Sequence, residues 1–502
     1  MTVSYDVVVV GSGGGAMTAA HLAQKHGLST VVVEKTDRIG GTSAYSGGAC
    51  WLPGSQVQQR AGIADSTESA RAYLDALLVD PDAAKVEAFL AESPRLVAEL
   101  EGDEALEFEW LPFPEYYDAP GRVGWGRSIQ PTNVKRVDLP PEVAALVRPP
   151  VERDRAGEPG RSTLSGGQSL IARLAWAFTR DGGTILTGHA VDTLLLEEGR
   201  VAGVVAGGER IDARHGVIVA AGGFERNEAW RQQYGVPGDA AWTMAPYETN
   251  AGEPIAAAVA VGAATALMDQ GWFCPGAEHP DGRGSFTLGF RGGVIVDADG
   301  RRYANECLAY DRFGREMAKA ANRIPSWFVF DSREGGRLPA ISMPETSPEE
   351  HLAAGTWVRE ETLEALAARL GLTALVETVS RFNGFAATGV DEDFGRGNDE
   401  YDTFFAGGDG PNRALTPVSE PPFYAARFVL SDLGTKGGLV TDTAARVLRE
   451  DGSAIPGLYA TSNSAASMMG ALYPGPGAPL GTAMVFASLA VRDIVTRAAP
   501  AS

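Results

Sequence analysis

The segment from Tyr5 to Glu34 constrains the fold more than any other part of the chain. It opens with an unbroken β-branched run, Tyr5–Val10, which is typical of a strand buried on both faces. A glycine-rich turn at 11–16 follows, then a helix-compatible stretch from Met17 to Gly27, then a second apolar run from Leu28 to Val33. This order predicts a βαβ unit with two parallel strands.

The turn reads Gly-Ser-Gly-Gly-Gly-Ala, which matches the dinucleotide-binding pattern G-x-G-x-x-G/A. Gly11 makes the tight turn, Gly13 lets the backbone approach a pyrophosphate, and the small Ala16 lets the helix pack on the strand. The helix N-terminus offers free N–H groups to the phosphates. Glu34 ends the second strand, where a carboxylate accepts hydrogen bonds from a ribose and disfavours NADP. The other turn residues expected at the cofactor are Gly14 and Gly15.

A second glycine-rich loop follows directly after Glu34. A nicotinamide site does not need such a loop. It resembles the loop that passes beside the pyrophosphate and the flavin in glutathione-reductase-like FAD folds, where backbone N–H groups face the isoalloxazine. We therefore expect a non-covalent FAD. The expected contacts are Lys35, Gly40, Gly41, Thr42, Ser43, Ser46, Gly47 and Gly48.

Distant segments add to the same domain. Val201–Val205 and Arg214–Ala221 are predicted strands, and Gly457–Asn463 predicts a further strand and turn. Gly481–Met484 leads into a helix through Val491, whose N-terminus we expect to face the flavin carbonyls, where negative charge grows on reduction. Both ends of the chain therefore contribute to one flavin site.

The predicted flavin domain is accordingly discontinuous, comprising residues 1–275 and 437–502, with a substrate domain at 276–436. Inside the insertion, a helical pattern covers Val358 to Leu370 and Leu372 to Phe385, and a polar glycine-rich stretch runs from 389 to 410.

Composition narrows the class of protein. The formal net charge of −21 weighs against a nucleic-acid partner, because phosphate binding needs clustered Lys and Arg. Three cysteines without C-x-x-C spacing favour a reducing compartment. We expect no membrane span, since no run of about 18 uncharged apolar residues is evident. The N-terminus enters a strand at once, so we expect no signal peptide and a cytoplasmic location.

With these motifs the chain resembles the 3-ketosteroid 1-dehydrogenases, within the wider family of fumarate-reductase-like flavoproteins. The resemblance covers nearly the whole chain and implies an α/β protein: a Rossmann-like, glutathione-reductase-like FAD domain with an inserted α+β substrate domain. Segments 432–438 and 473–477 are more specific to the steroid enzymes, whereas 302–306 is shared by the wider family. The stretches that carry the resemblance are Val9–Gly15, Gly40–Gly48, Pro114–Gly121, Ala220–Phe224, Arg301–Arg315, Ser431–Gly438 and Tyr459–Gly481.

The resemblance implies removal of two hydrogens from the steroid A ring, giving a double bond between carbons 1 and 2. Tyr310 would take the proton from carbon 2, assisted by Tyr116, although the adjacent Tyr117 fits if the register slips by one. Tyr473 and the Gly477 N–H would bind the carbon 3 carbonyl. A hydride would pass to flavin N5, and an external electron acceptor, for which a quinone is the candidate, would reoxidise the flavin.

These residue types suit the implied chemistry. Two donors on a ketone oxygen stabilise an enolate, and losing one typically costs about 3–4 kcal/mol of barrier. An ionised carboxylate base is costly in a dry pocket, whereas tyrosine, with a reference pKa of about 10, needs a neighbouring hydroxyl to stabilise its phenolate. Aromatic residues such as Phe286 and Phe290 fit either the steroid pocket or ordinary core packing.

The resemblance also implies further cofactor contacts: Ala190, Val191, Ala221, Gly222, Asn463, Pro479 and Leu480. One departure is visible at Ser462, because the family usually has glycine before Asn463. This departure concerns local flavin contacts rather than the reaction.

Three alternatives stay open. A 3-ketosteroid 4-dehydrogenase would act on the other side of the same carbonyl. A fumarate-reductase-like enzyme would need clustered Arg and His to clamp two carboxylates, and the sequence shows no such cluster beside the tyrosines. A flavin-binding module without catalysis would bind FAD but would not be bleached by a 3-ketosteroid. The six histidines show no metal-binding spacing, so we expect no metal.

Overall fold

The computed structural model describes residues 3–499, and the chain forms two compact units. The first unit comprises residues up to 230, 245–270 and the chain from 434 onward, and the second comprises 231–244 and 271–433. The sequence assigned 231–244 to the flavin domain. Hydrogen bonds explain the difference, because Arg231 Nη1 and Thr243 Oγ1 both donate to the carboxylate of Asp432, at 2.7 and 2.6 Å.

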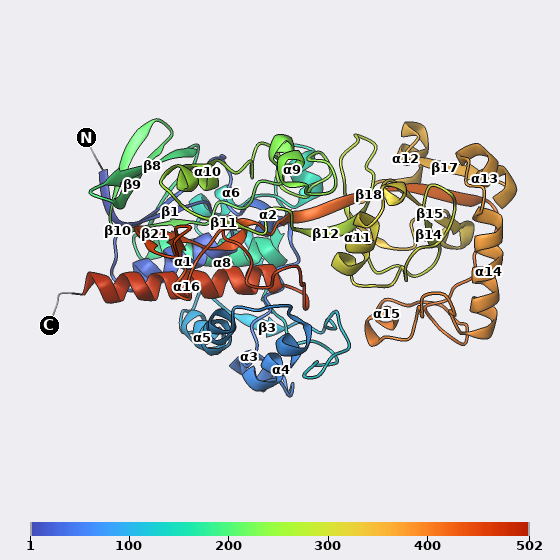
Figure 1. Ribbon diagram of the computed structural model, residues 1–502, viewed down its shortest axis with the longest axis horizontal. Helices are drawn as coiled ribbons and strands as arrows, with labels where there is room; N and C mark the ends of the chain where they lie inside the picture. Colours follow the sequence, from blue (N-terminus) through green and yellow to red (C-terminus); the bar gives the residue numbers. More distant parts are fainter. Residues whose placement is uncertain (1–2, 500–502) are drawn as a thin grey trace. The chain divides into compact units, whose positions relative to one another are not determined.

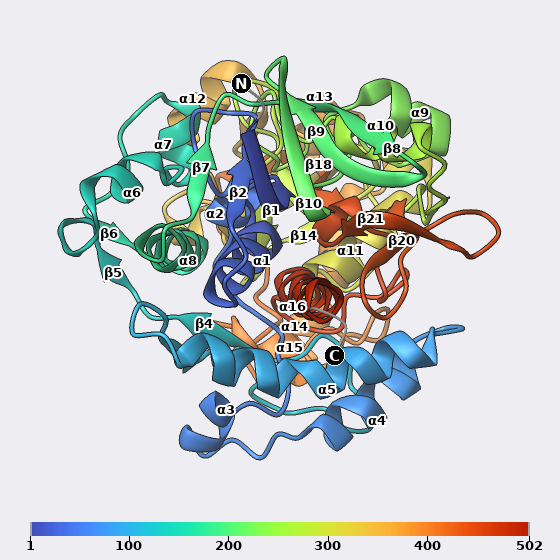
Figure 2. The ribbon, with the colours of Figure 1, turned by 90° about the vertical axis from the view of Figure 1, so that its left-hand side faces the viewer.

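The first unit is built on a sheet with four central parallel strands, β1 (Val3–Val10), β2 (Thr30–Val33), β10 (Glu209–Val219) and β21 (Ala454–Ala460) (Figures 1 and 2). Strands β1 and β2 are the predicted βαβ pair. The apolar runs are long because both faces of these strands are covered, and Val7, Val8 and Val9 have no exposed surface. The predicted α/β class is confirmed.

The edges complete this sheet. Strand β7 (Thr184–Leu186) pairs with β2, and β20 (Arg446–Leu448) pairs with β21. An antiparallel extension is formed by β8 (Val191–Glu197) and β9 (Arg200–Ala206), with β9 pairing with β10. The predicted strand at 201–205 is therefore part of β9.

Two helices cross the sheet next to one another, α1 (Gly14–Lys25) and α16 (Ala478–Ala498) (Figure 2). Both begin earlier than the sequence suggested. The turn glycines themselves enter α1, and α16 starts with Pro479 in its first turn after Gly477, whose φ of +81° only glycine adopts readily.

Helix α16 satisfies the length and hydropathy of a membrane span, with 21 residues and a mean hydropathy of 1.4. However, 61% of its apolar window is buried inside the fold, where it packs on α1 and on α5 (Ala83–Glu101). A core helix passes the same test, so this helix is weak evidence for a span.

The first unit carries further short elements around this frame. They are α2 (Gly41–Tyr45), α3 (Gln56–Arg60), α4 (Thr67–Leu77), β3 (Phe108–Trp110), β4 (Ile129–Pro131), β5 (Val134–Lys135), α6 (Pro141–Leu146), α7 (Val151–Arg155), β6 (Thr163–Leu164), α8 (Gly166–Arg180), α10 (Glu253–Ala260), β11 (Thr265–Ala266) and β19 (Gly438–Leu439). Helix α9 (Glu228–Tyr234) contains the boundary of the units at residue 230.

The second unit contains a sheet in which β15 (Ser326–Asp331) pairs antiparallel with β14 (Val294–Val296) and β18 (Phe423–Thr435). Strand β17 (Trp357–Glu360) lies beside β18, so the predicted helix beginning at Val358 is wrong there. Helix α13 (Leu363–Leu370) begins only after Thr362, whose hydroxyl caps it, and α14 (Leu375–Thr388) follows. Both helices pack apolar side chains onto the sheet.

The remaining elements of the second unit are β12 (Gly271–Ala277), β13 (Phe286–Leu288), α11 (Tyr310–Ala318), β16 (Ile341–Met343), α12 (Pro348–Ala354) and α15 (Glu400–Phe404). Helix α15 lies inside the stretch 389–410 that the sequence analysis described only as polar and glycine-rich. Asp399 caps it by accepting from the Tyr401 N–H at 2.7 Å.

Candidate active site

The predicted cofactor residues gather at the carboxyl ends of the parallel strands in the first unit. Gly11 follows β1, Glu34 follows β2, Ala220 follows β10 and Thr461 follows β21. Ligands of open α/β sheets bind at this edge. Segments that are hundreds of residues apart in sequence are therefore brought to one place by strand order alone.

Close backbone approach explains the turn glycines. Gly11 has a φ of +100°, and a Cβ there would lie 2.5 Å from the Ala220 oxygen. At Gly14 a Cβ would lie 2.8 Å from Leu480 Cδ2, and at Gly15 it would lie 2.4 Å from Ser462 Oγ. The first turn of α1 is thus in contact with Leu480 of α16 and with Ser462, and a side chain at Gly14 or Gly15 would require these neighbours to move.

A hydroxyl that the sequence analysis missed ties the two glycine-rich loops together. Ser12 Oγ donates to the Glu34 carboxylate and accepts from the Gly40 N–H at 2.9 Å. Glu34 also accepts from the Thr36 N–H at 2.9 Å, and the Gly14 N–H donates to Ser43 Oγ at 3.0 Å. Because an ionised carboxylate has about four acceptor sites, Glu34 keeps capacity for a ribose hydroxyl. Ser12 is the variable position of the motif, so the pattern gave no signal for it.

The residues present fit an FAD. Thr42 Oγ1 is buried and makes no hydrogen bond within residues 3–499, as expected for a group that faces a ligand. The first turn of α1 directs N–H groups that have no intrahelical acceptor toward the same strand edge. Val191 is buried, and two residues before it the His189 N–H donates to the Glu34 oxygen at 2.8 Å.

Some of the predicted cofactor-binding residues bind other protein groups instead, and some are exposed to solvent. The exposed Lys35 ammonium pairs with Glu253 of α10 at 2.6 Å. The Ala221 N–H donates to Ser464 Oγ, which in turn donates to the Gly222 oxygen. Three other predicted contacts, Ser46, Gly47 and Ala190, are exposed. The Gly48 N–H donates to Ser46 Oγ at 3.1 Å, and the cofactor contacts of Gly41, Gly48, Asn463 and Pro479 remain predictions.

Ser462 stands where the family usually has glycine, and its backbone shows why. Its φ is +59°, in the left-handed region that favours glycine. It begins the 3-10 turn Ser462–Ser464 after β21, and its hydroxyl lies beside Gly15. The chain therefore accepts a strained residue directly behind the phosphate-binding turn.

Two predicted catalytic tyrosines lie together in the first unit. The rings of Tyr116 and Tyr473 are 5.2 Å apart between centroids, and both are buried. Gly477, four positions after Tyr473, is the N-cap of α16, and a Cβ on it would lie 2.2 Å from the Ala49 oxygen. The Tyr116 N–H donates to the Pro474 oxygen at 3.0 Å, which joins the two tyrosine loops.

The third predicted tyrosine, Tyr310, belongs to the second unit. It is the first residue of α11, it is 6% exposed, and the Phe286 ring meets it edge-on with centroids 4.8 Å apart. Phe290 instead contacts Phe313, Phe328 and Phe428, so it is part of the core of this unit.

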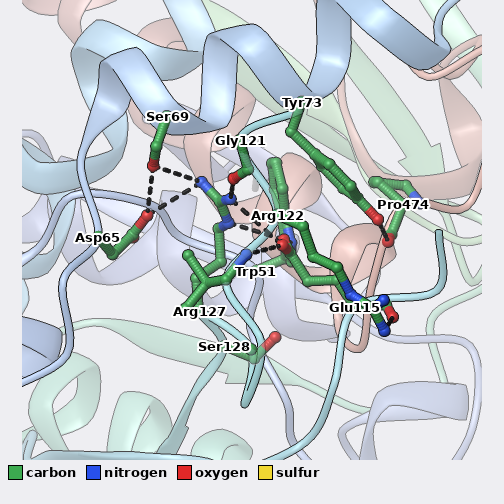
Figure 3. A network of polar contacts seen from close by, with 12 residues as sticks. Trp51, Asp65, Ser69, Tyr73, Glu115, Gly121, Arg122, Arg127, Ser128 and Pro474 are labelled. Carbon is green, nitrogen blue, oxygen red and sulfur yellow. Dashed lines mark hydrogen bonds and ion pairs between the residues drawn. The ribbon is translucent and has the colours of Figure 1, made fainter. Parts of the chain in front are cut away.

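A buried ion cluster lies beside Tyr116, and we name it the Arg127 cluster (Arg127, Glu115 and Asp65; Figure 3). Arg127 binds Glu115 at 2.7 Å and Asp65 at 2.9 Å, and all three side chains are inaccessible to solvent. Glu115 also accepts from Trp51 Nε1 at 3.0 Å. Burial outweighs these contacts and raises the pKa of Glu115. Arg127 is paired within the protein and inaccessible to solvent, so it does not form a clamp for a dicarboxylate substrate.

A second buried cluster, the Arg302 cluster, precedes Tyr310 in the other unit. Arg302 binds Glu306 at 2.8 Å and Asp391 at 2.9 Å, and Arg396 binds Glu306 at 3.1 Å. The two arginines hold the pKa of Glu306 below its ordinary value despite complete burial. The segment 302–306 therefore anchors the loop leading to Tyr310.

Within residues 3–499, one group of side chains has the composition of a metal site: His21, Asp103 and Asp181. Arg180 already donates to both Asp103 oxygens, at 3.0 and 2.6 Å, and to Asp181 at 3.0 Å. Burial lowers the pKa of His21 to about 4. A guanidinium thus neutralises these carboxylates, and we assign the group a structural role.

Comparison with known proteins agrees with this geometry. A family model described as FAD binding domain matches residues 6–480. A 3-oxosteroid 1-dehydrogenase of Rhodococcus opacus is 41% identical, over 97% of this chain and 98% of its own length. A 4-oxocyclohexanecarboxylate 2-dehydrogenase of Sinomonas cyclohexanicum is 35% identical, over 99% and 94% of the two chains.

Among solved structures, the 3-ketosteroid Δ1-dehydrogenase of Sterolibacterium denitrificans, in complex with 1,4-androstadiene-3,17-dione, matches with a TM-score of 0.89. It is 32% identical, and the match covers 99% of this chain and 100% of that one. The chain therefore belongs to the FAD-binding flavoprotein family and, within it, to the 3-oxosteroid 1-dehydrogenase group.

Proposed function

We propose that this enzyme uses FAD to introduce a double bond between carbons 1 and 2 of 3-ketosteroids. The observation that carries the proposal is the buried pair Tyr116 and Tyr473, joined through the Pro474 oxygen to the loop that ends in Gly477. This loop meets the cofactor edge of the sheet, because Gly477 caps the helix that contacts α1.

The carbonyl-binding donors are Tyr473 Oη and the Gly477 N–H. A ketone oxygen that receives two hydrogen bonds stabilises the enolate formed when carbon 2 loses its proton. Gly477 is needed for the second donor, because its left-handed conformation and its contact with the Ala49 oxygen exclude a side chain. Each donor is worth about 3–4 kcal/mol of barrier in comparable sites.

We assign Tyr310 the role of base and Tyr116 the role of the hydroxyl that supports it. Tyr310 is the first residue of α11, and a helix N-terminus favours negative charge. The Phe286 ring packs edge-on against it, and a neutral phenol costs less to bury beside such an apolar group than an ionised carboxylate.

Bound FAD supplies the two-electron acceptor for the hydrogen that leaves carbon 1. The chain holds it at the strand edge through the turn 11–16, Glu34 and the loop 40–48. We infer that an external acceptor, with a quinone as the candidate, reoxidises it, and that the enzyme works in the cytoplasm. Its cysteines Cys50, Cys274 and Cys307 are free and buried, which fits a reducing compartment.

Anaerobic mixing with a 4-ene-3-ketosteroid tests the proposal. The flavin absorbance should bleach, and the product should carry a new double bond between carbons 1 and 2. The Tyr310→Phe variant should retain FAD but lose nearly all turnover. A fully saturated 3-ketosteroid separates the alternatives, since a product unsaturated at carbons 4 and 5 would identify a 4-dehydrogenase.

A second substrate class is favoured by the relative that acts on 4-oxocyclohexanecarboxylate. Both classes contain a cyclohexanone, so the donors Tyr473 and Gly477 would serve either one. Comparing kcat/KM for a 3-ketosteroid and for 4-oxocyclohexanecarboxylate decides between them. A steroid-specific enzyme should prefer the larger substrate because burying its additional rings adds binding energy.

A further inference from the structure

The segment from Ala471 to Gly477 contains both proposed carbonyl donors, and nearly every one of its backbone oxygens is held. Lys436 Nζ donates to the oxygens of Ala471 and Leu472, at 2.9 and 3.0 Å. After Tyr473, the Pro474 oxygen accepts from Tyr73 Oη at 2.8 Å. The oxygens of residues 475–477 accept from the Ala478 N–H, from the Ser128 hydroxyl and from the Trp51 N–H.

We propose that Tyr73 and Lys436 are positioning residues for this reaction, which hold the Tyr473 hydroxyl and the Gly477 N–H in the geometry that an enolate oxygen requires. The proposal rests on the proposed function. Lys436 lies in the segment 432–438 that resembles the steroid enzymes, but the resemblance gives no role to Lys436 or to Tyr73, and neither is assigned contact with substrate.

Tyr73 connects the two loops that carry Tyr116 and Tyr473. Figure 3 shows its hydroxyl at the Pro474 oxygen. Tyr73 lies in α4, is completely buried, and accepts from the Tyr117 N–H at 3.1 Å while it donates to the Pro474 oxygen. Burial raises the pKa of Tyr73 well above its ordinary value, so the hydroxyl stays a donor. Loss of this hydroxyl would release both loops from one common anchor.

Lys436 acts on the other side of Tyr473. It is 1% exposed, its ammonium binds two successive carbonyls, and it lies 6.0 Å from the centroid of the Tyr473 ring. Burying a lysine is costly unless its charge is well compensated. The backbone oxygens and the ring face supply partners, and in return the ammonium fixes the peptide units that lead into Tyr473.

Rigid donors matter because an oxyanion site stabilises charge only if the donors need not move during the reaction. A displacement of about 1 Å can cost about a hundredfold in rate. Tyr73→Phe removes one oxygen atom and keeps the ring, so it tests this argument with little change in packing.

The experiment compares Tyr73→Phe with the control variant Tyr459→Phe. Tyr459 is also buried in the first unit, and its hydroxyl donates to Asp493 of α16 at 2.7 Å rather than to a carbonyl of the segment 471–477. Tyr73→Phe should lower kcat for a 3-ketosteroid by about tenfold or more with little change in KM. Tyr459→Phe should lose similar thermal stability but keep wild-type kcat, and both should retain FAD.

Equilibrium binding gives a second readout. A steroid with a phenolic A ring resembles the enolate at its oxygen, so Tyr73→Phe should bind it more weakly by a factor similar to the loss in kcat. Lys436→Met, if it folds, should likewise lose kcat and affinity for the phenolic steroid. Lys436→Arg keeps the positive charge, so its kcat should lie between those of Lys436→Met and the wild type.

Three outcomes would overturn the inference: unchanged kcat in Tyr73→Phe, an equal loss in Tyr459→Phe, or a loss confined to KM. If the wild-type enzyme oxidises no 3-ketosteroid, the proposed function itself fails. Wild-type turnover therefore distinguishes the two failures.

Discussion

The two buried ion clusters differ in their charge balance. In the Arg127 cluster one arginine faces two carboxylates, whereas in the Arg302 cluster two arginines face two carboxylates. Burial is similarly complete in both, yet the pKa of Glu115 is raised and that of Glu306 is lowered. The number of neighbouring cations, rather than the degree of burial, therefore decides whether the pKa of the buried carboxyl lies above or below its ordinary value.

This difference matches what each cluster holds. The balanced Arg302 cluster fixes the loop before Tyr310, with Glu306 four residues from the tyrosine. The unbalanced Arg127 cluster relies on neutral donors, Trp51 Nε1 and the Val123 N–H, which bind Glu115 at 3.0 and 2.8 Å. Trp51 connects the cluster to the loop of Tyr473, since its backbone N–H donates to the Gly477 oxygen at 3.1 Å while its Nε1 donates to Glu115.

The largest effect is expected from Glu306→Gln. The change leaves two buried arginines with one carboxylate, and breaking a buried pair typically costs about 3–5 kcal/mol of unfolding free energy. Denaturant unfolding of the variant and the wild type measures it. Glu349→Gln, at an exposed position in α12, is the matched control and should change stability by less than about 0.5 kcal/mol.

A loss below about 1 kcal/mol in Glu306→Gln would show that water or relaxation compensates the arginines, and the charge-balance argument would fail for the second unit.

The nucleotide-binding half of the site could be predicted from sequence because its signals are local. The strand, glycine turn, helix and acid of residues 5–34 follow one another within one supersecondary unit. The structure confirms this unit, and it explains the turn glycines by contacts with Ala220 and Ser462.

The supporting residues could not be predicted, because their partners are remote. Tyr73 and Pro474 are 401 positions apart, and Lys436 meets its carbonyl partners through the fold. The sequence around Tyr73 has the pattern of a helix at the protein surface, and such a pattern does not indicate a contact with a remote loop. The wrong helix at Val358 has a similar cause, since a short apolar run takes the strand conformation when β18 offers a pairing edge.

A smaller effect is expected from Glu115→Gln. The variant keeps the pair of Arg127 and Asp65 at 2.9 Å and balances one cation with one anion, so only hydrogen bonds to the lost oxygen are affected. We expect a loss of about 1–2 kcal/mol in unfolding free energy, measured as for Glu306→Gln. An equal loss in the two variants would mean that the count of charges does not distinguish the clusters.

The smallest effect, and the sharpest test, is the pH dependence of these two losses. The ordinary pKa of both residues is 4.5. The native pKa of Glu115 lies above that value, so the native state binds the proton more tightly, and wild-type stability falls as pH rises from 4.5 through the native pKa. The native pKa of Glu306 lies below 4.5, so its contribution is complete above 4.5 and is lost as pH falls through the native value.

The difference in unfolding free energy between wild type and variant, which we call the deficit of the variant, should therefore depend on pH in opposite ways for the two variants. The deficit of Glu115→Gln should shrink as pH rises above 4.5, whereas that of Glu306→Gln should shrink as pH falls below 4.5. Each slope is at most about 1.4 kcal/mol per pH unit, since one proton is involved. Unfolding measured across this range resolves the slopes, and parallel pH profiles would show that both carboxyls titrate alike and that the clusters are electrostatically equivalent.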